Sequence, residues 1–109
     1  MSYYFIVDSY IKGNPEEYAE YIRNVKPIVE SYGGQYLVRT DYVESWNRLR
    51  APERSIIIRF PNREAIEKCF ASEQYQKIMA GRVNNVDSRA IIVPGVEEEN
   101  EDTSAQNQF

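Results

Sequence analysis

The sequence contains no histidine among its 109 residues. Histidine is the commonest acid–base group near neutral pH and a frequent ligand of zinc and haem iron. Its absence excludes Ser-His and Cys-His nucleophiles, histidine-ligated haem and His-containing zinc sites. The sequence also lacks a Gly-rich dinucleotide fingerprint. We therefore expect no metal and no cofactor, and any chemistry must use carboxylates, tyrosines, arginines, lysines or the single cysteine.

Other features that mark particular protein classes are also missing. Cys69 is the only cysteine, so no internal disulfide can form, and we expect a reducing, cytoplasmic setting. No apolar run is long enough to cross a bilayer, and the N-terminus lacks the pattern of a signal peptide. The net charge of -4 and the pI near 4.9 argue against nucleic-acid binding. We expect neither a nucleic acid nor a membrane as partner.

The composition that remains, 42% hydrophobic and 28% charged, is that of an ordinary globular domain. The length favours one domain, which we place at residues 1–96. Much of the acidity falls in the last thirteen residues, 97–109, which lack a periodic apolar pattern. We expect this acidic tail to be disordered.

Hydrophobic periodicity predicts the element order βαββαβ, with two helices in the second helical region. Asn14 suits the N-cap of the first helix, Gly33-Gly34 suits its end, and Pro27 should kink it or break its hydrogen-bond ladder. Asn62 and Ser72 are expected to cap the later helices. Strands are expected over residues 3–10, 35 to about 46, 55–60 and 88–93.

This order is that of the ferredoxin-like split βαβ fold, an α+β arrangement with helices on one face of a four-stranded antiparallel sheet. The third strand nevertheless carries isoleucine on both faces, with Ile56 and Ile58 on one side and Ile57 on the other. A bare apolar sheet face is unusual on a monomer, and a second copy of the chain is its simplest cover. We therefore expect a homodimer formed through the open sheet face.

Charged residues late in three strands are the first candidates for a site. Strict alternation of side chains places Asp8, Arg39 and Arg59 on the open face, with Asp8 and Arg39 near one end, about 10 Å apart, and Arg59 nearer the other. The fixed charge and planar donor fork of Arg39 suit a ligand carboxylate or enolate. The alternative is that Arg39 pairs with Asp8, Asp41 or a partner-chain acid and only sets the dimer register. The same two interpretations apply to Arg59, and for both arginines the structural one is favoured.

Three other side chains leave alternatives open, and a fourth has one interpretation. Arg82 is expected either to cap a helix end or to reach into the pocket. Tyr75 is expected to pack or to bond backbone, with a role as a phenol acid as the alternative. Trp46 suits either a pocket wall or, the favoured interpretation, an anchor of the dimer. Cys69, on the apolar face of its helix, is interpreted as an inert core thiol.

Several short stretches together resemble a known family. SYGGQYLVR, RFPNREA, SEQYQ, Arg82 and IIVPG match the marks of a family of small bacterial proteins labelled as a domain of unknown function, within the dimeric α+β barrel superfamily. The resemblance covers roughly residues 4–95 and implies a dimer with a pocket in or beside each sheet. The superfamily includes cofactor-free monooxygenases, haem-handling proteins, isomerases and lyases, so the resemblance implies no single reaction. The chain departs from the family pattern at Thr40-Asp41, where relatives often have Gly-Gly, and at Asn47 and Arg59, where they often have acids.

The leading hypothesis is a homodimeric barrel that acts as a cofactor-free enzyme, of isomerase, lyase or monooxygenase type, on a small organic anion. Arg39, with Arg82, would hold the anion and stabilise developing negative charge, and an Asp or Tyr would move the proton. The alternative is a non-catalytic binding or stress-associated protein with a vestigial pocket. The predicted ligand-binding residues are Arg39, Asp8, Arg82 and Arg59.

Overall fold

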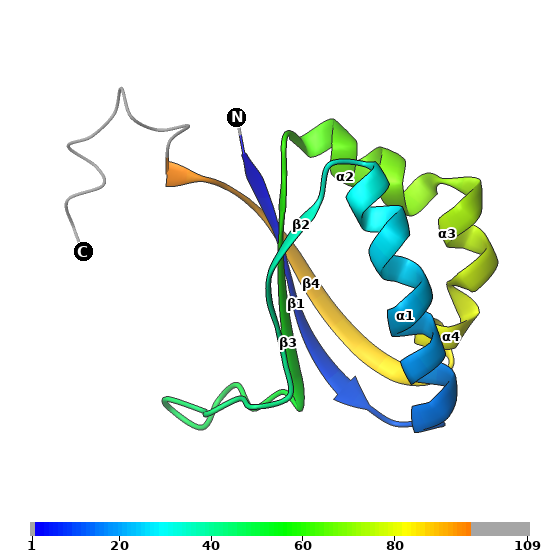
Figure 1. Cartoon of the computed structure of the whole chain (residues 1–109). Coiled ribbons are helices and arrows are strands. Elements are labelled where there is room, and N and C mark those ends of the chain that lie inside the picture. Colours follow the sequence, from blue (N-terminus) through cyan, green and yellow to red (C-terminus); the bar gives the residue numbers. More distant parts are fainter. Residues whose placement is uncertain (1, 97–109) are drawn as a thin grey trace.

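A computed structural model gives the structure of the protein and describes residues 2–96, so that the predicted acidic tail lies outside the described residues. The sheet is four-stranded and antiparallel throughout, in the order β2-β3-β1-β4, and all helices lie on one face of it (Figure 1). The predicted ferredoxin-like α+β fold is confirmed. No helix among residues 2–96 is both long and apolar enough to span a membrane. The elements are β1 (Tyr3–Ile11), α1 (Pro15–Ser31), β2 (Gln35–Thr40), β3 (Arg54–Phe60), α2 (Arg63–Ala71), α3 (Glu73–Ile78), α4 (Ala80–Val83) and β4 (Val86–Pro94).

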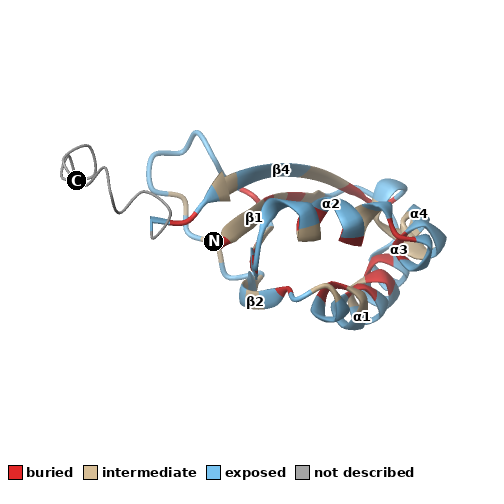
Figure 2. Ribbon diagram, turned by 90° about the horizontal axis from the view of Figure 1, so that it is seen from above, coloured by how far each residue is buried: buried red, intermediate tan, exposed pale blue. Residues whose placement is uncertain are grey.

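The core lies between the sheet and the helices, where the buried segments of both meet (Figure 2). From the sheet it receives Val7, Ile56, Ile58 and Phe60, which are the side chains that the alternation of strands β1 and β3 predicts. The helices contribute a stripe at helical spacing. Its buried members are Tyr18, Tyr21, Val25 and Val29 of α1, Ile66 and Cys69 of α2, and Tyr75 of α3.

Local sequence signals fix the helix ends. The Asn14 side-chain oxygen accepts hydrogen bonds from the backbone N–H groups of Glu16 and Glu17 at 2.8 and 3.2 Å, as predicted for an N-cap. Helix α1 runs without interruption through Pro27 to Ser31. The chain then turns sharply at Gly33, whose φ of +86° lies in the left-handed region that favours glycine.

Strand β2 differs from the prediction in two ways. It ends at Thr40 rather than near residue 46, and residues 41–53 form a loop. Its register also shifts, because Tyr36 pairs with Ile58 whereas Val38 pairs with Ile57, so that Leu37 is an extra residue in a β-bulge.

The bulge turns Arg39 to the helix-covered face. Arg39 pairs with Ile56, whose side chain is buried beneath the helices, and not with a residue of the open face. The prediction that Arg39 shares the open face with Asp8 is therefore wrong. A prediction from strict period-two alternation does not detect an inserted residue, and one inserted residue reverses the direction of every side chain that follows it in the strand.

Candidate ligand cavity

A cavity of about 440 Å³ lies between the sheet and the helices, within a single chain. Most of its lining is apolar. The floor comes from β1, β3 and β4, including Phe5, Val7, Ile58 and Ile92, and the roof from α1 and α2, including Ile22, Val25 and Phe70. The polar side chains on its wall are Ser9, Tyr18, Tyr21, Tyr36, Arg39, Glu67, Tyr75, Arg82 and Ser88.

Three of these polar side chains form a hydrogen-bonded chain. The Arg82 Nε donates to the Tyr75 hydroxyl at 2.9 Å, and that hydroxyl shares a hydrogen bond of 2.9 Å with the Tyr21 hydroxyl. Two hydroxyl groups carry two protons, and a single hydrogen bond between them uses one. The other proton remains available to an acceptor, so the Tyr21–Tyr75 pair can donate to a ligand while it stays connected to Arg82.

Two tyrosines that line the cavity, Tyr21 and Tyr36, are suited to donate and not to accept a proton. Burial, reinforced by the neighbouring Tyr75, raises the pKa of Tyr21 far above its usual value. Burial also raises the pKa of Tyr36 to about 12, although the Arg39 charge partly opposes the shift. Both phenols are therefore neutral donors at physiological pH.

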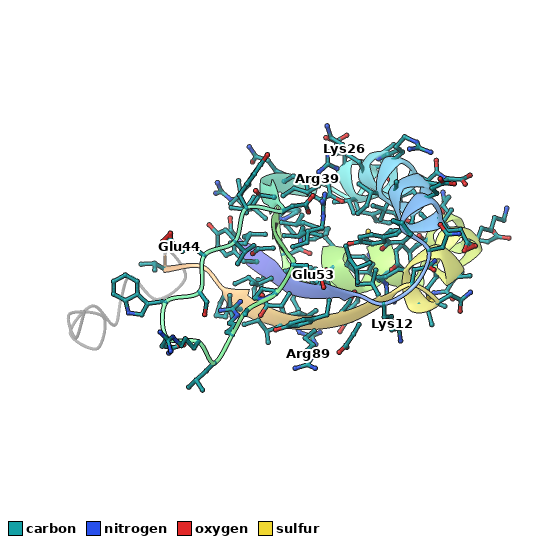
Figure 3. The ribbon with its side chains drawn as sticks, turned by 90° about the horizontal axis from the view of Figure 1, so that it is seen from below. Lys12, Lys26, Arg39, Glu44, Glu53 and Arg89 are labelled. Atoms are coloured by element: carbon teal, nitrogen blue, oxygen red, sulfur yellow. The ribbon has the colours of Figure 1, made fainter. Side chains whose placement is uncertain are left out.

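Arg39 stands at the exposed side of the cavity. In Figure 3 it projects from β2 toward the side on which α1 lies, whereas Arg89 projects from the opposite side of the sheet. The Arg39 guanidinium lies 5.2 Å from the centre of the Tyr36 ring, a cation–π distance. Among residues 2–96, no carboxylate lies within 4.0 Å of it. Arg39 thus brings a positive charge that no described carboxylate neutralises.

Glu67 is the one carboxylate among the described residues that line the cavity. It forms an ion pair with Arg63 on the next turn of α2. The cavity therefore carries two guanidinium groups and a carboxylate that already has a partner, so its electrostatic character favours an anion.

The sheet separates the four predicted binding residues into two groups. Arg39 and Arg82 line the same cavity, while Asp8 and Arg59 lie on the open face. Asp8 forms a bidentate ion pair with Arg50 of the 41–53 loop, with Arg50 Nη2 2.7 Å from the carboxylate. Arg59, nearer the other end of the sheet, donates to the Ser2 hydroxyl at 3.0 Å.

Sequence reasoning missed the hydroxyl groups of the site. Tyr18 and Tyr21 recur at helical spacing, which predicts only that they pack in the core, and both are buried. A tyrosine in place of phenylalanine or leucine at a core position is the available signal, because a buried phenol needs a hydrogen-bond partner. Arg50, the partner of Asp8, had no such signal, since 42 residues separate the two in the chain.

Comparison with known protein families shows where the chain belongs. The model of the family described as "Domain of unknown function (DUF1330)" matches residues 2–96, which is the whole of the described fold. The chain belongs to the DUF1330 family. The resemblance found in the sequence is thereby confirmed, and DUF1330 membership assigns no reaction. No curated protein matches the chain.

Solved structures share the DUF1330 fold at low sequence identity. RPA0582 of Rhodopseudomonas palustris, of unknown function, is 19% identical with a TM-score of 0.72, covering 86% of this chain and 82% of its own. A dimeric ferredoxin-like protein of unknown function from Jannaschia sp. CCS1 is 10% identical with a TM-score of 0.71, and the match covers 87% of this chain and 100% of that one. SnoaB of Streptomyces nogalater, a cofactor-independent oxygenase, is 13% identical with a TM-score of 0.63, and the match covers 86% of this chain and 92% of that one. These similarities establish the fold alone.

Proposed function

We propose that this DUF1330 protein binds a small organic anion in the cavity between its sheet and its helices. The observation that carries the proposal is the pair of arginines, Arg39 and Arg82, on the wall of an otherwise mostly apolar cavity of about 440 Å³. That volume falls within the range of small-molecule sites, roughly 300–1,000 Å³. A guanidinium beside apolar surface recognises a carboxylate, enolate or phenolate, while the apolar wall excludes water from the body of the ligand.

The same groups suit a cofactor-free reaction that passes through an anion. Arg82, Tyr75, Tyr21 and Arg39 all offer donors, which is the arrangement that stabilises negative charge developing on oxygen. We propose that the substrate forms an enolate or phenolate that these donors stabilise. The cofactor-independent oxygenase SnoaB, which has this fold, supports the proposal by analogy.

A binding protein without catalytic activity is the second candidate. One observation favours it: Glu67, the carboxylate on the described cavity wall, is occupied by its ion pair with Arg63, and the chain has no histidine. A ligand that is already anionic needs no general base. In that case the arginines and tyrosines would only hold it.

We also propose that a second copy of the chain covers the open face of the sheet. Ile91 on that face is 57% exposed, and the 41–53 loop exposes Tyr42, Trp46 and Leu49 by 96%, 99% and 89%. The acids Asp8 and Asp87 on this face pair with Arg50 and Arg89 of the same chain, so burial leaves neither acid unpaired. The dimeric Jannaschia protein supports this arrangement, which leaves each cavity within its own protomer.

Calorimetric titration with 2-naphthoate, an anion with a compact apolar body, tests the ligand proposal. We expect binding that weakens by about tenfold or more in the Arg39→Gln/Arg82→Gln double variant, since each guanidinium provides a charge-assisted hydrogen bond. The control is Arg23→Gln, which removes one positive charge from an exposed position on α1 and should leave the affinity unchanged. Equal affinity in all three proteins would contradict the proposal.

Deuterium uptake at the central carbon of benzoylacetone, a β-diketone, separates the enzyme from the binding protein. A site that stabilises enolates should accelerate the exchange, and the acceleration should disappear in the double arginine variant. A protein that only binds leaves the exchange at the rate of the buffer. Proton NMR follows the exchange directly.

The single tryptophan provides the test of the dimer. Because Trp46 is almost fully exposed on one protomer, its emission should shift to shorter wavelength as dilute protein is concentrated and the dimer forms. Trp46→Ala should weaken the dimer by at least tenfold in analytical ultracentrifugation. A monomer at all accessible concentrations would refute the assignment of the open face.

A further inference from the structure

We propose that the ligand binds in one orientation only, with a single hydrogen-bond-accepting head group at the Ser9 end of the cavity and an apolar body toward Phe5 and Phe70. This inference rests on the proposed function, because it concerns the ligand of the same cavity. It narrows the ligand class to amphiphiles with one anionic or carbonyl head.

The floor of the cavity changes in polarity from one end to the other. The pairing of the four strands arranges the side chains that face the helices in successive rows across the sheet. The first row is apolar apart from one phenol, the second contains one arginine, and the third is entirely polar. In order, these rows are Tyr36, Ile58, Phe5 and Ile92; then Arg39, Ile56, Val7 and Ala90; then Arg54, Ser9 and Ser88.

The polar row contains two buried atoms without a partner. The Ser9 residue is 1% exposed and lines the cavity, and its hydroxyl makes no hydrogen bond to any described residue. The Nε of Arg54, which is the register partner of Ser9 on β3, is likewise buried and unpaired among the described residues. A different nitrogen of Arg54 binds Asp41 at 2.6 Å, which holds the side chain in place.

Buried polar groups in folded proteins nearly always have partners, so this pair requires an explanation. Both free groups can donate, Ser9 through its hydroxyl and Arg54 through Nε–H. Ser9 lines the cavity, whereas Arg54 lies beside it on β3 and is not among the lining residues. A carboxylate, enolate or carbonyl oxygen at this end of the cavity would accept from the Ser9 hydroxyl, which therefore marks a subsite for the acceptor head of a ligand.

Helix α4 lies near the start of β4, on the side of the polar row. Gly81 of α4 packs against α1 so closely that an added Cβ would lie 3.0 Å from the Tyr21 Cβ. The Gly81 carbonyl accepts from the Asn85 side chain at 2.8 Å, and β4 begins at the next residue, close to Ser88. Arg82 of this helix lines the cavity, where its Nε donates to the Tyr75 hydroxyl.

The opposite end is apolar around Phe5 and Phe70, and the polar group in its row is the neutral Tyr36 phenol at the β2 edge. Phe5 and Phe70 lie with their ring centres 4.7 Å apart, and Ile92 and Ile58 complete the surface. A second charge on the ligand that entered the Phe5 and Phe70 corner would be buried against apolar surface, which is strongly unfavourable. The structure therefore selects against molecules that are charged at both ends.

Ser9→Ala tests the head-group subsite. Because the hydroxyl has no hydrogen-bond partner among residues 2–96, we expect the melting temperature of the variant to equal or exceed that of the wild type. The affinity for 2-naphthoate should nevertheless fall by about tenfold, the effect of one hydrogen bond to a charged acceptor. The matched control is Ser55→Ala, on the other face of the same sheet, which should leave the affinity unchanged.

A second probe tests the orientation without any variant. Naphthalene-2,6-dicarboxylate carries a carboxylate at each end of the same ring system, and we expect it to bind the wild-type protein at least tenfold more weakly than 2-naphthoate. If 2-naphthoate itself does not bind, the proposed function and this inference both fail. If it binds, but Ser9→Ala has no effect or the dicarboxylate binds equally well, only the orientation is overturned.

Discussion

The hydroxyl pair of Tyr21 and Tyr75 allows a quantitative test of how the site is held together. Both residues are almost completely buried, 8% and 3% exposed, and Tyr75 is the central member of the chain from Arg82 to Tyr21. Tyr75→Phe removes two hydrogen bonds, and Tyr21→Phe removes only one. The two substitutions should therefore lower the free energy of unfolding by different amounts, although each deletes one phenolic oxygen.

The expected magnitudes follow from the number and kind of bonds. A neutral hydrogen bond contributes about 1 kcal/mol and one to a charged group about 1.5–3 kcal/mol. Arg82 is half-buried and can recover part of its loss from water. We expect a loss in the free energy of unfolding of about 2 kcal/mol for Tyr75→Phe, about 1 kcal/mol for Tyr21→Phe, and about 2 kcal/mol for the double variant.

Urea denaturation followed by circular dichroism, at one fixed protein concentration, measures these values. The decisive quantity is the coupling energy of the double-mutant cycle, which we expect to be about 1 kcal/mol. Strict additivity, within about 0.3–0.5 kcal/mol, would mean that the two hydroxyl groups do not interact and would refute the hydrogen-bonded chain.

Two further predictions concern the core. Burial raises the pKa of Cys69 from 9.0 to about 11, so the thiol ionises at lower pH in the unfolded chain than in the folded one. The stability that this difference contributes, on the order of 2 kcal/mol, is fully present below pH 9 and is lost as the pH rises to about 11. The wild type should thus lose stability more steeply than Cys69→Ala from pH 8 to about pH 10 in urea titrations, and parallel curves would contradict this. Gly34→Ala would place a Cβ 2.4 Å from the Val29 Cγ1 and 2.9 Å from its carbonyl oxygen. It should cost about 1–3 kcal/mol in the same assay, and an unchanged midpoint would show that the close approach is not needed.

The sequence predicted the topology and the buried face of the sheet because hydrophobic periodicity records which side chains avoid water. Phe60, Ile58 and Val7 followed that rule. Arg39 did not, because the extra residue Leu37 in β2 leaves no mark in the hydrophobic pattern. The direction of a side chain beyond a bulge depends on how a neighbouring strand pairs, which is a property of the folded sheet.

The site was predicted in part for a similar reason. Arg39 and Arg82 were both identified as candidates, although they are 43 positions apart, and the structure brings them to one cavity. The charge of Asp8 and the alternation of β1 predict its place on the open face, but its ion pair with Arg50 could not be foreseen because a loop without regular structure delivers the partner. Ser9 carried no signal, since its significance is that its hydroxyl is buried without a partner in the described part of the chain.

Methyl NMR during a titration with 2-naphthoate tests the central claim most directly, because isoleucines lie on both faces of the sheet. Ile58 and Ile92 line the cavity, whereas Ile6 and Ile57 lie on the open face. We expect the methyl resonances of Ile58 and Ile92 to shift in proportion to occupancy while those of Ile6 and Ile57 stay in place. Shifts confined to Ile6 and Ile57 would place the ligand on the open face and contradict the account.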